Sequence, residues 1–433
     1  MRAVDAQAVG SVIFLSHPAT LESWLQHLES RNREAIVLGL DRVALVCDRL
    51  GLQPTFPIIT VGGTNGKGSV CAYLEAVLTA ANYRVGCYSS PHLLRYNERV
   101  HLDGREATDA ELCAALDAVE AARGEVPLTY FEQGTLAAMW LFQRASLDVA
   151  VLEVGLGGRL DAVNVWDADC AVVTSVDLDH QQFLGDTREA IGFEKAGIFR
   201  AQRPAICGDV SPPLSLLVRA GEIGAQLMCV GEDIWVEISD AGWICRVGDT
   251  VYPALPRLAM PGRHQYANAA CAVAALWTLR ERLPVSMKAL RAGLASARQH
   301  GRFQVIGQQP LRILDVAHNP HAARALAVNL ADLPPGGRVI AVCAMLADKD
   351  VAAVIQILKP YVQYWHCAGL DVARGLDAAG FASFLRAAGC AFTSHSSVCE
   401  AWRAACLQAG PADTILAFGS FHTVAEVMAA AGG

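Results

Sequence analysis

The stretch 59-ITVGGTNGKGSVCAYLEAVL-78 decides the fold, because it joins an apolar strand to a helix through a glycine-rich loop. The loop departs from the P-loop pattern G-x-x-x-x-G-K-[ST] at both ends: Val61 stands at the first glycine, and Gly68 stands directly after Lys67. Glycines at a helix N-terminus still let backbone N–H groups surround an anion, while Lys67 neutralises phosphate charge. The stretch therefore predicts a phosphate-binding loop. The alternative is a plain turn with a solvated lysine.

Apolar runs alternate with Ala- and Leu-rich helical runs on either side of this loop. In the first part of the chain the predicted strands are 57–63, 84–90, 149–155, 171–177 and 205–210. A second series begins near residue 297, with predicted strands at 311–317, 338–346, 361–369 and 414–420. Continuous apolar strands separated by helices indicate parallel sheets covered on both faces. We therefore predict an α/β protein of two domains, residues 1–296 and 297–433.

Three segments around these strands have their own patterns. Residues 20–52 show helical periodicity, with Thr20 as the N-cap and no full capping box, because Ser23 stands at its third position. Residues 91–104 form a long polar loop, and a Pro-rich stretch at 250–262 precedes an Ala-rich helix.

Composition limits the class of protein. The 433 residues are 53% hydrophobic and 18% charged, and the net charge of −8 argues against bulk nucleic-acid binding. The 14 cysteines form no C-x-x-C pair, which indicates thiols in a reducing compartment. No apolar run reaches the roughly 18 residues of a membrane span, and the N-terminus lacks the basic region of a signal peptide. We expect a cytoplasmic protein that binds neither nucleic acid nor membrane.

Polar residues follow each of the first four predicted strands of the N-terminal domain. They are GGTNGKGS, SSPH, Glu153 with GLGGR, and Asp177-Leu178-Asp179-His180. Ligands bind beyond the carboxyl ends of parallel strands, so these four segments predict one site.

The chemistry of single residues at this site stays open on local grounds. Glu153 could serve Mg²⁺ beside a phosphate loop, or it could pair with Arg159. A lone His180 is more often structural than a ligand, and Lys195 on a helix is more often solvated. In DVAHNPHAA, Asp315 and His318 would face the first domain across a cleft, or the aspartate would only shape a turn.

The motifs together resemble one family, the folylpolyglutamate synthase/dihydrofolate synthase branch of the Mur-ligase superfamily. The resemblance rests on GTNGKGS (63–69), SSPHLLRYNERV (89–100), TYFE (129–132), LEVGLGGRLDAVN (152–164), FEKAGI (193–198), GRFQ (301–304) and DVAHNP (315–320), in the family's order. One departure is Val316, where the family often has glycine. The resemblance implies an N-terminal P-loop-type ATPase domain and a C-terminal Rossmann-like domain, with the active site in the cleft between them.

The resemblance also implies an activity and its residues. The activity is ATP-dependent ligation of L-glutamate to dihydropteroate and to reduced folates through an acyl phosphate, with two Mg²⁺ ions. We expect a monomer, since a cleft between two domains of one chain needs no partner. The implied ATP-binding residues are Thr64, Asn65, Gly66, Lys67, Gly68, Ser69, Asn268, Arg302 and Asp315. The implied metal ligands are Ser69, Ser90, Glu153, His180 and Lys195 as a carbamate, and the implied pterin site is Thr129, Tyr130, Phe131, Glu132 and Leu160. Lys67, Lys195 and His318 would be catalytic.

Two other functions remain alternatives on the sequence. A Mur-type ligase acting on a nucleotide-linked muramyl peptide would share the fold and the acyl phosphate. A P-loop switch NTPase would need an [NT]-K-x-D element, and the nearest string, ADKD at 347–350, lacks the Asn or Thr.

Overall fold

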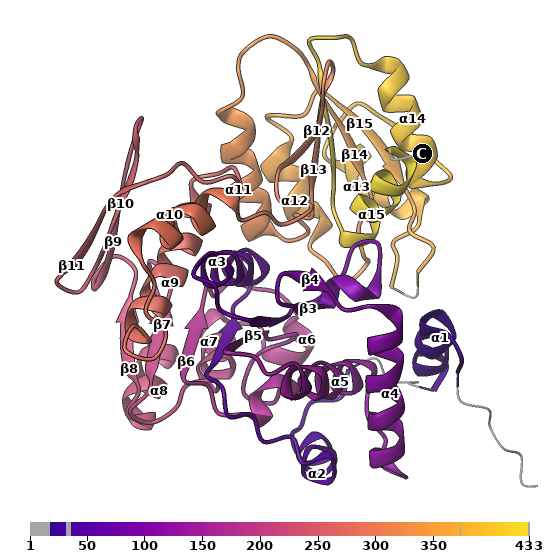
Figure 1. The fold of residues 1–433 in the computed structure, drawn as a ribbon. Coiled ribbons are helices and arrows are strands. Elements are labelled where there is room, and N and C mark those ends of the chain that lie inside the picture. The colour runs from indigo at the N-terminus through magenta and orange to yellow at the C-terminus, as the bar shows by residue number, and fades with distance from the viewer. Residues whose placement is uncertain (1–17, 32–35, 373, 432–433) are drawn as a thin grey trace, which may run out of the picture.

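The computed structural model describes residues 18–31, 36–372 and 374–431, and it contains two α/β parts, each with its own large sheet (Figure 1). The first sheet has the order β4-β3-β2-β5-β1-β6-β7-β8. Its strands are β1 (Ile58–Gly62), β2 (Val85–Tyr88), β3 (Val100–Leu102), β4 (Arg105–Glu106), β5 (Val149–Glu153), β6 (Cys170–Val173), β7 (Pro204–Cys207) and β8 (Gln226–Cys229). From β2 to β8 all neighbours are parallel, as predicted.

Helices cover both faces of this sheet because successive strand residues point to opposite sides. In β1, Ile58 belongs to one apolar core and Ile59 to the other. The helices on the Ile59 side are α3 (Lys67–Ala80), α9 (His264–Thr278) and α10 (Met287–Ser296). Those on the Ile58 side are α1 (Leu21–Arg31), α2 (Asp41–Leu50), α4 (Asp109–Arg123), α5 (Tyr130–Arg144), α7 (Arg188–Ala196) and α8 (Leu214–Ile223). The short helices α6 (Gln181–Leu184), η1 (Tyr96–Arg99) and η2 (Ala162–Val165) lie in its connections.

The helical periodicity of residues 20–52 corresponds to two helices, α1 and α2, with the described residues 36–40 outside both. Thr20 does cap α1, accepting a hydrogen bond from the Ser23 N–H at 3.2 Å. In turn, the Ser23 hydroxyl accepts a hydrogen bond from the Thr20 N–H at 3.0 Å. A serine thus completes the reciprocal cap that the sequence analysis excluded for want of Glu or Gln.

The strands of the first part that were not predicted include β3, β4, β8 and those of a three-stranded sheet. Strand β3 lies within the polar loop 91–104 and pairs antiparallel with β2. A separate antiparallel sheet, β9 (Ile234–Ser239), β10 (Gly242–Val247) and β11 (Thr250–Leu255), packs against α9 before the second part begins (Figure 1). In β10, Trp243 and Cys245 are buried while Ile244 and Arg246 are exposed, which is the alternation of a sheet with one solvated face.

The second sheet has the order β12-β13-β17-β14-β15-β16, parallel except for β12. Its strands are β12 (Gln304–Gln308), β13 (Leu311–Asp315), β14 (Val339–Cys343), β15 (Tyr364–Ala368), β16 (Phe392–His395) and β17 (Thr414–Phe418). Helices α11 (Pro320–Ala331), α12 (Val351–Leu358) and α13 (Ala378–Ala387) cover one face, and α14 (Val398–Gln408) and α15 (Phe421–Ala431) cover the other. The predicted α/β class is confirmed, while the exact boundary at 296/297 stays a prediction.

Candidate active site

The four polar segments lie side by side because their strands are neighbours. The order β2-β5-β1-β6 brings the carboxyl ends of the four predicted strands to one edge of the first sheet. The segment after β13 meets this edge from the second part: the Asn65 side chain donates to Asn319 Oδ1 at 3.1 Å, and Asn319 donates to Asp179 at 2.9 Å. The two series of strand ends therefore face each other, as the cleft prediction requires.

The glycine-rich loop has a shape that only glycine permits at Gly66. This residue has φ of +90°, and a Cβ there would lie 2.5 Å from Asn268 Oδ1. Helix α3 begins immediately after it, so the free N–H groups of the first turn face the loop. The Lys67 ammonium donates to the Gly63 carbonyl at 3.1 Å, within the loop itself. This is a cradle for an anion, closed on one side by Asn268.

The outer wall of the loop, Thr64, is fixed to the strand end of β6. Its N–H donates to the Ser175 carbonyl at 2.8 Å, and its hydroxyl donates to the Asp177 carbonyl at 3.0 Å. On the helix side the Ser69 hydroxyl is buried and accepts from the Gln265 amide at 3.3 Å. The loop is therefore held by β6 and α9.

Arg302 brings the second part of the chain to this cradle. A Cβ on Gly68 would lie 3.5 Å from Arg302 Nη2 and 3.7 Å from Glu153 Oε2, so both charged groups line the loop. Burial lowers the pKa of Arg302, and its Nη1 has no hydrogen-bond partner among the described residues. Asp315 accepts backbone N–H bonds from Phe303 and Ala317, at 2.9 and 2.8 Å. An unpartnered buried cation beside the loop is suited to an anionic ligand.

Glu153 and His180 offer groups that suit a divalent cation. Burial raises the pKa of Glu153, and the charge of Lys67 only partly offsets this. The carboxylate accepts the Ser90 N–H at 3.2 Å, whereas Arg159 is bound to Glu194 at 2.9 Å. The Arg159 alternative for Glu153 was therefore wrong.

His180 is held neutral and partly unpartnered. Burial lowers its pKa to about 4, and its Nδ1 is buried without a hydrogen-bond partner among the described residues. A neutral imidazole with a free nitrogen is the form that ligates metals. Glu153, Ser90 and His180 thus carry oxygen and nitrogen donors of the kinds that bind metal ions.

Lys195 is not the solvated lysine that its local sequence favours. Its side chain is 3% exposed, and no hydrogen bond or ion pair joins its ammonium to another residue of the described ranges. Burial, with repulsion from Lys67, lowers its pKa to about 7. The amine is therefore neutral in a large fraction of molecules near neutral pH.

His318 lies at the same junction. Its Nδ1 is 2.8 Å from the Val316 carbonyl, which directs Nε2 toward Asp179 Oδ2 at 3.5 Å. Lys349 Nζ contacts the other oxygen of Asp179 at 2.5 Å. Although burial raises it, the His318 bond and the Lys349 charge hold the pKa of Asp179 well below its ordinary range. Sequence reasoning had placed Asp179 in a polar segment and Lys349 in the ADKD string, but it had given neither residue a role.

Four of the five predicted pterin residues, Thr129 to Glu132, occupy the start of α5. Thr129 and Glu132 form a reciprocal capping box at 3.2 and 2.7 Å. Glu132 is also bound to Arg42 at 2.7 Å. These two polar side chains therefore shape α5, and their hydrogen bonds are largely used within the protein.

The aromatic members form a shelf near the strand ends. Tyr130 contacts Tyr96 edge to face, with ring centroids 5.9 Å apart, and a Cβ on Gly155 would lie 2.6 Å from the Phe131 ring. The Arg99 guanidinium lies over both Tyr96 and Tyr130, at 5.2 and 5.5 Å. Arg99 was missed because SSPHLLRYNERV was treated as one motif. Leu160 lies across the LGGR turn, where its carbonyl accepts the Gly39 N–H at 3.3 Å.

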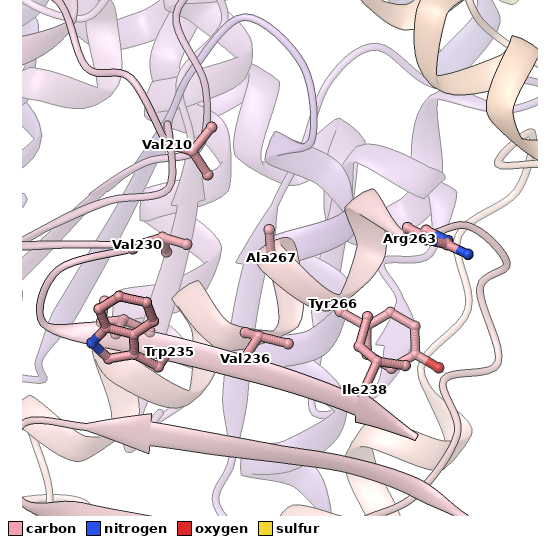
Figure 2. Close-up of a pocket in the computed structure, with 10 residues that line it drawn as sticks. Val210, Val230, Trp235, Val236, Ile238, Arg263, Tyr266 and Ala267 are labelled. Carbon is pink, nitrogen blue, oxygen red and sulfur yellow. The ribbon is translucent and has the colours of Figure 1, made fainter. Parts of the chain in front are cut away.

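A hollow elsewhere in the first part is apolar and separate from these groups. Figure 2 shows it between β9 and α9, about 290 Å³ in volume, with Trp235, Ile238 and Tyr266 among its lining. It contains none of the predicted site residues. The hollow therefore lies apart from the strand ends that carry the predicted site residues.

Both α/β parts of the chain match models of known families. The Mur ligase middle domain matches residues 61–209, and the Mur ligase glutamate ligase domain matches residues 301–421. The dihydrofolate synthase/folylpolyglutamate synthase of Escherichia coli strain K12 is 48% identical over 409 residues, 94% of each chain. That of Haemophilus influenzae is 41% identical and covers 96% of this chain and 98% of its own. The chain belongs to the dihydrofolate synthase/folylpolyglutamate synthase family of Mur ligases.

Solved structures of the family have the same fold. E. coli FolC in complex with DHPP and ADP superposes with a TM-score of 0.90 at 48% identity, covering 95% of this chain and 97% of that one. The Yersinia pestis bifunctional enzyme complexed with AMPPNP and a Mn ion also gives 0.90, at 47% identity, covering 96% and 98%. The predicted family, fold and enzyme class, an ATP-dependent ligase forming carbon–nitrogen bonds, are confirmed. The solved relatives include one complexed with AMPPNP and a Mn ion and one with Mn, AMPPNP and L-glutamate bound.

Proposed function

We propose that this chain joins L-glutamate to dihydropteroate, giving dihydrofolate, and to reduced folates, giving polyglutamates. One observation carries the proposal: Lys67, Glu153 and Arg302 converge on the same glycine loop from two α/β parts. ATP and a carboxylate are both anionic, so phosphoryl transfer between them needs the positive charge of Lys67 and Arg302, and Glu153 would hold a metal ion that adds to this charge. The curated relatives over nearly the full length have both activities in their names.

The nucleotide would lie along the loop between the two parts. Backbone N–H groups of residues 64–69 would surround its phosphates, and Lys67 would leave the loop carbonyls to pair with them. Asn268 closes the loop beside Gly66, Arg302 would neutralise phosphate charge, and Asp315 would bind the nucleotide from the second part.

Two Mg²⁺ ions would be held by Ser69, Ser90, Glu153, His180 and Lys195 as its carbamate. The ions would supply charge neutralisation on the phosphates of ATP. Lys195 suits this role because a neutral buried amine reacts with CO₂, and the product exchanges a cation for an anion. Glu153 suits it because a cation would offset the cost of its burial.

The pterin would rest on Tyr130 and Phe131, beside Leu160, with Thr129 and Glu132 holding the start of α5 in place. Its carboxylate would attack the γ-phosphorus, ADP would leave, and the glutamate amine would then displace phosphate from the acyl phosphate. His318, 3.5 Å from Asp179, would lie near the phosphate in transit. Closure of the two parts would exclude water from the acyl phosphate.

We also propose a monomer in the cytoplasm. The chain supplies both walls of the site itself, and all of its cysteines are free thiols, which suits a reducing compartment. No helix of the described residues has the length and apolarity to cross a bilayer.

Phosphate release tests the proposed substrates directly. The purified chain is given ATP, Mg²⁺ and L-glutamate, with dihydropteroate in one reaction and tetrahydrofolate in a second. We expect glutamate-dependent phosphate release in both, with the ligated products seen by mass spectrometry. Activity only with a UDP-muramyl peptide would overturn the folate assignment, and ATP hydrolysis without ligation would favour the switch NTPase.

A further inference from the structure

Asp179 of the first part lies at a contact with the second part of the chain. Its Oδ1 is 2.5 Å from Lys349 Nζ, and its Oδ2 accepts from the Asn319 amide at 2.9 Å. The side chains of Lys349 and Asp179 are only 7% and 9% exposed. Lys349 follows β14 of the second sheet, whereas Asp179 follows β6 of the first.

The same carboxylate fixes the backbone of its neighbour. Asp179 Oδ1 accepts the His180 N–H at 2.9 Å, and His180 has φ of +51°, in the left-handed region that residues other than glycine rarely adopt. A non-glycine residue keeps this backbone conformation only when surrounding contacts hold it. The imidazole carried by this backbone has the buried, unpartnered Nδ1 described above.

Asn319 connects this contact to the phosphate loop. It caps α11 through its Oδ1, which accepts the Ala322 N–H at 2.9 Å, and it also contacts the Asn65 side chain. The orientation of Asp179 is thus determined by groups of the second part that also touch the nucleotide loop.

We infer that Lys349 is a positioning residue that couples domain closure to metal binding. By holding Asp179 it keeps His180 in the orientation that ligates the metal, and the metal site is complete only while the two parts are closed. The inference rests on the proposed metal-binding role of His180. It gives a role to the ADKD string that had been considered only as a nucleotide-base element.

The test compares Lys349→Met with a matched variant at another contact between the two parts. Arg324 also joins the two parts, binding Asp177 at 2.6 Å, and its loss leaves Asp179 untouched. Mn²⁺ affinity is measured by electron paramagnetic resonance on the full chain with ADP and without glutamate. We expect Lys349→Met to weaken Mn²⁺ binding by about tenfold or more, as loss of groups behind a metal ligand does. Arg324→Met should stay near wild type, and Lys349→Arg should retain most of the affinity.

A double-variant cycle guards against a general loss of folding. Asp179→Asn should weaken Mn²⁺ binding as Lys349→Met does, and combining the two should cost little more than either alone. Unchanged affinity in Lys349→Met, equal loss in Arg324→Met, or additive losses in the double variant would each overturn the inference alone. A wild-type chain that neither binds Mn²⁺ nor ligates glutamate would overturn the proposed function with it.

Discussion

Lys195 owes its chemistry to its surroundings. On α7, Phe193 is 41% exposed while Lys195, two residues on, is buried, which is the reverse of what hydropathy favours. No local pattern could reveal this, because α7 packs against the turn after β5, where the Arg159 N–H donates to the Glu194 carbonyl, and because repulsion from Lys67 adds to the lowering of the pKa. The sequence therefore identified Lys195 only through the family resemblance.

We predict that Lys195 carries a carbamate and that activity falls in acid. Because the pKa of its amine is about 7, protonation increases as the pH drops below that value, and a protonated amine cannot react with CO₂. With ¹³C-labelled bicarbonate, a carbamate signal should be visible by NMR in the wild type. Lys195→Ala should lose both the signal and ligation.

The control is the exposed Lys288 on α10. Lys288→Ala should keep the carbamate signal and the rate. A signal that persists in Lys195→Ala would show that another lysine carries the modification.

Other site residues were predictable because strand ends are visible in sequence. The loop around Lys67, and Glu153 after its apolar run, follow strands that continuous hydrophobicity marks clearly. Since neighbouring parallel strands end at one edge, their grouping followed from the fold class alone. His180 was uncertain on local grounds because a lone histidine carries no spacing information.

At the scale of elements, α4 and α5 start with the same reciprocal cap in two different places. Thr108 and Glu111 form it on α4, and Thr129 and Glu132 form it on α5, which carries the aromatic shelf. Comparing the two caps therefore distinguishes the contribution of an N-cap to helix stability from a contribution of α5 to substrate binding.

We predict that Thr129→Ala and Thr108→Ala each lower the free energy of unfolding by about 1 kcal/mol, since each loses an N-cap. Only Thr129→Ala should raise the KM for dihydropteroate, because fraying there moves Tyr130 and Phe131. Urea denaturation measures the first effect and phosphate-release kinetics the second. Equal KM values in the two variants would remove the start of α5 from the pterin site.

The sheet β9–β11 was missed for a physical reason. Its strands are six residues long, β9 and β11 expose most of their side chains, and proline at 253 lies within the last. Short strands with many exposed side chains lack the continuous apolar run by which fully buried strands are recognised, so their sequences resemble those of loops. The break between α1 and α2 was missed because residues 20–52 keep their helical period across it.

For the whole molecule, the proposed nucleotide site is shared between parts with separate cores. The loop at 63–69 belongs to the first, and Arg302 and Asp315 belong to the second. A ligand bound by both parts must make their unfolding cooperative, since it binds only the native arrangement of the two.

We predict that ADP with Mg²⁺ merges the thermal transitions of the two parts into one at higher temperature. At a concentration one hundred times its Kd, ADP adds about 2.7 kcal/mol of stability. Differential scanning calorimetry measures both effects. In Arg302→Ala, which lacks the bridging cation, the transitions should stay separate with ADP present. A rise confined to one transition in the wild type would contradict a shared site.

The contacts between the two parts lay beyond sequence reasoning. Asp179 and Lys349 are 170 positions apart, and each stands in a string with several acidic neighbours. Their pairing depends on how one sheet is set against the other, which periodicity does not determine.

The outer sheet β9–β11 has a practical consequence. The turn at Asp240 and Ala241 is exposed, and its strands pair with none of the strands that carry the site (Figure 1). A fluorescent reporter inserted between these two residues should leave glutamate ligation unchanged, as measured by the same phosphate assay. Paired with a dye on the second part, it would make opening and closing visible in single working molecules.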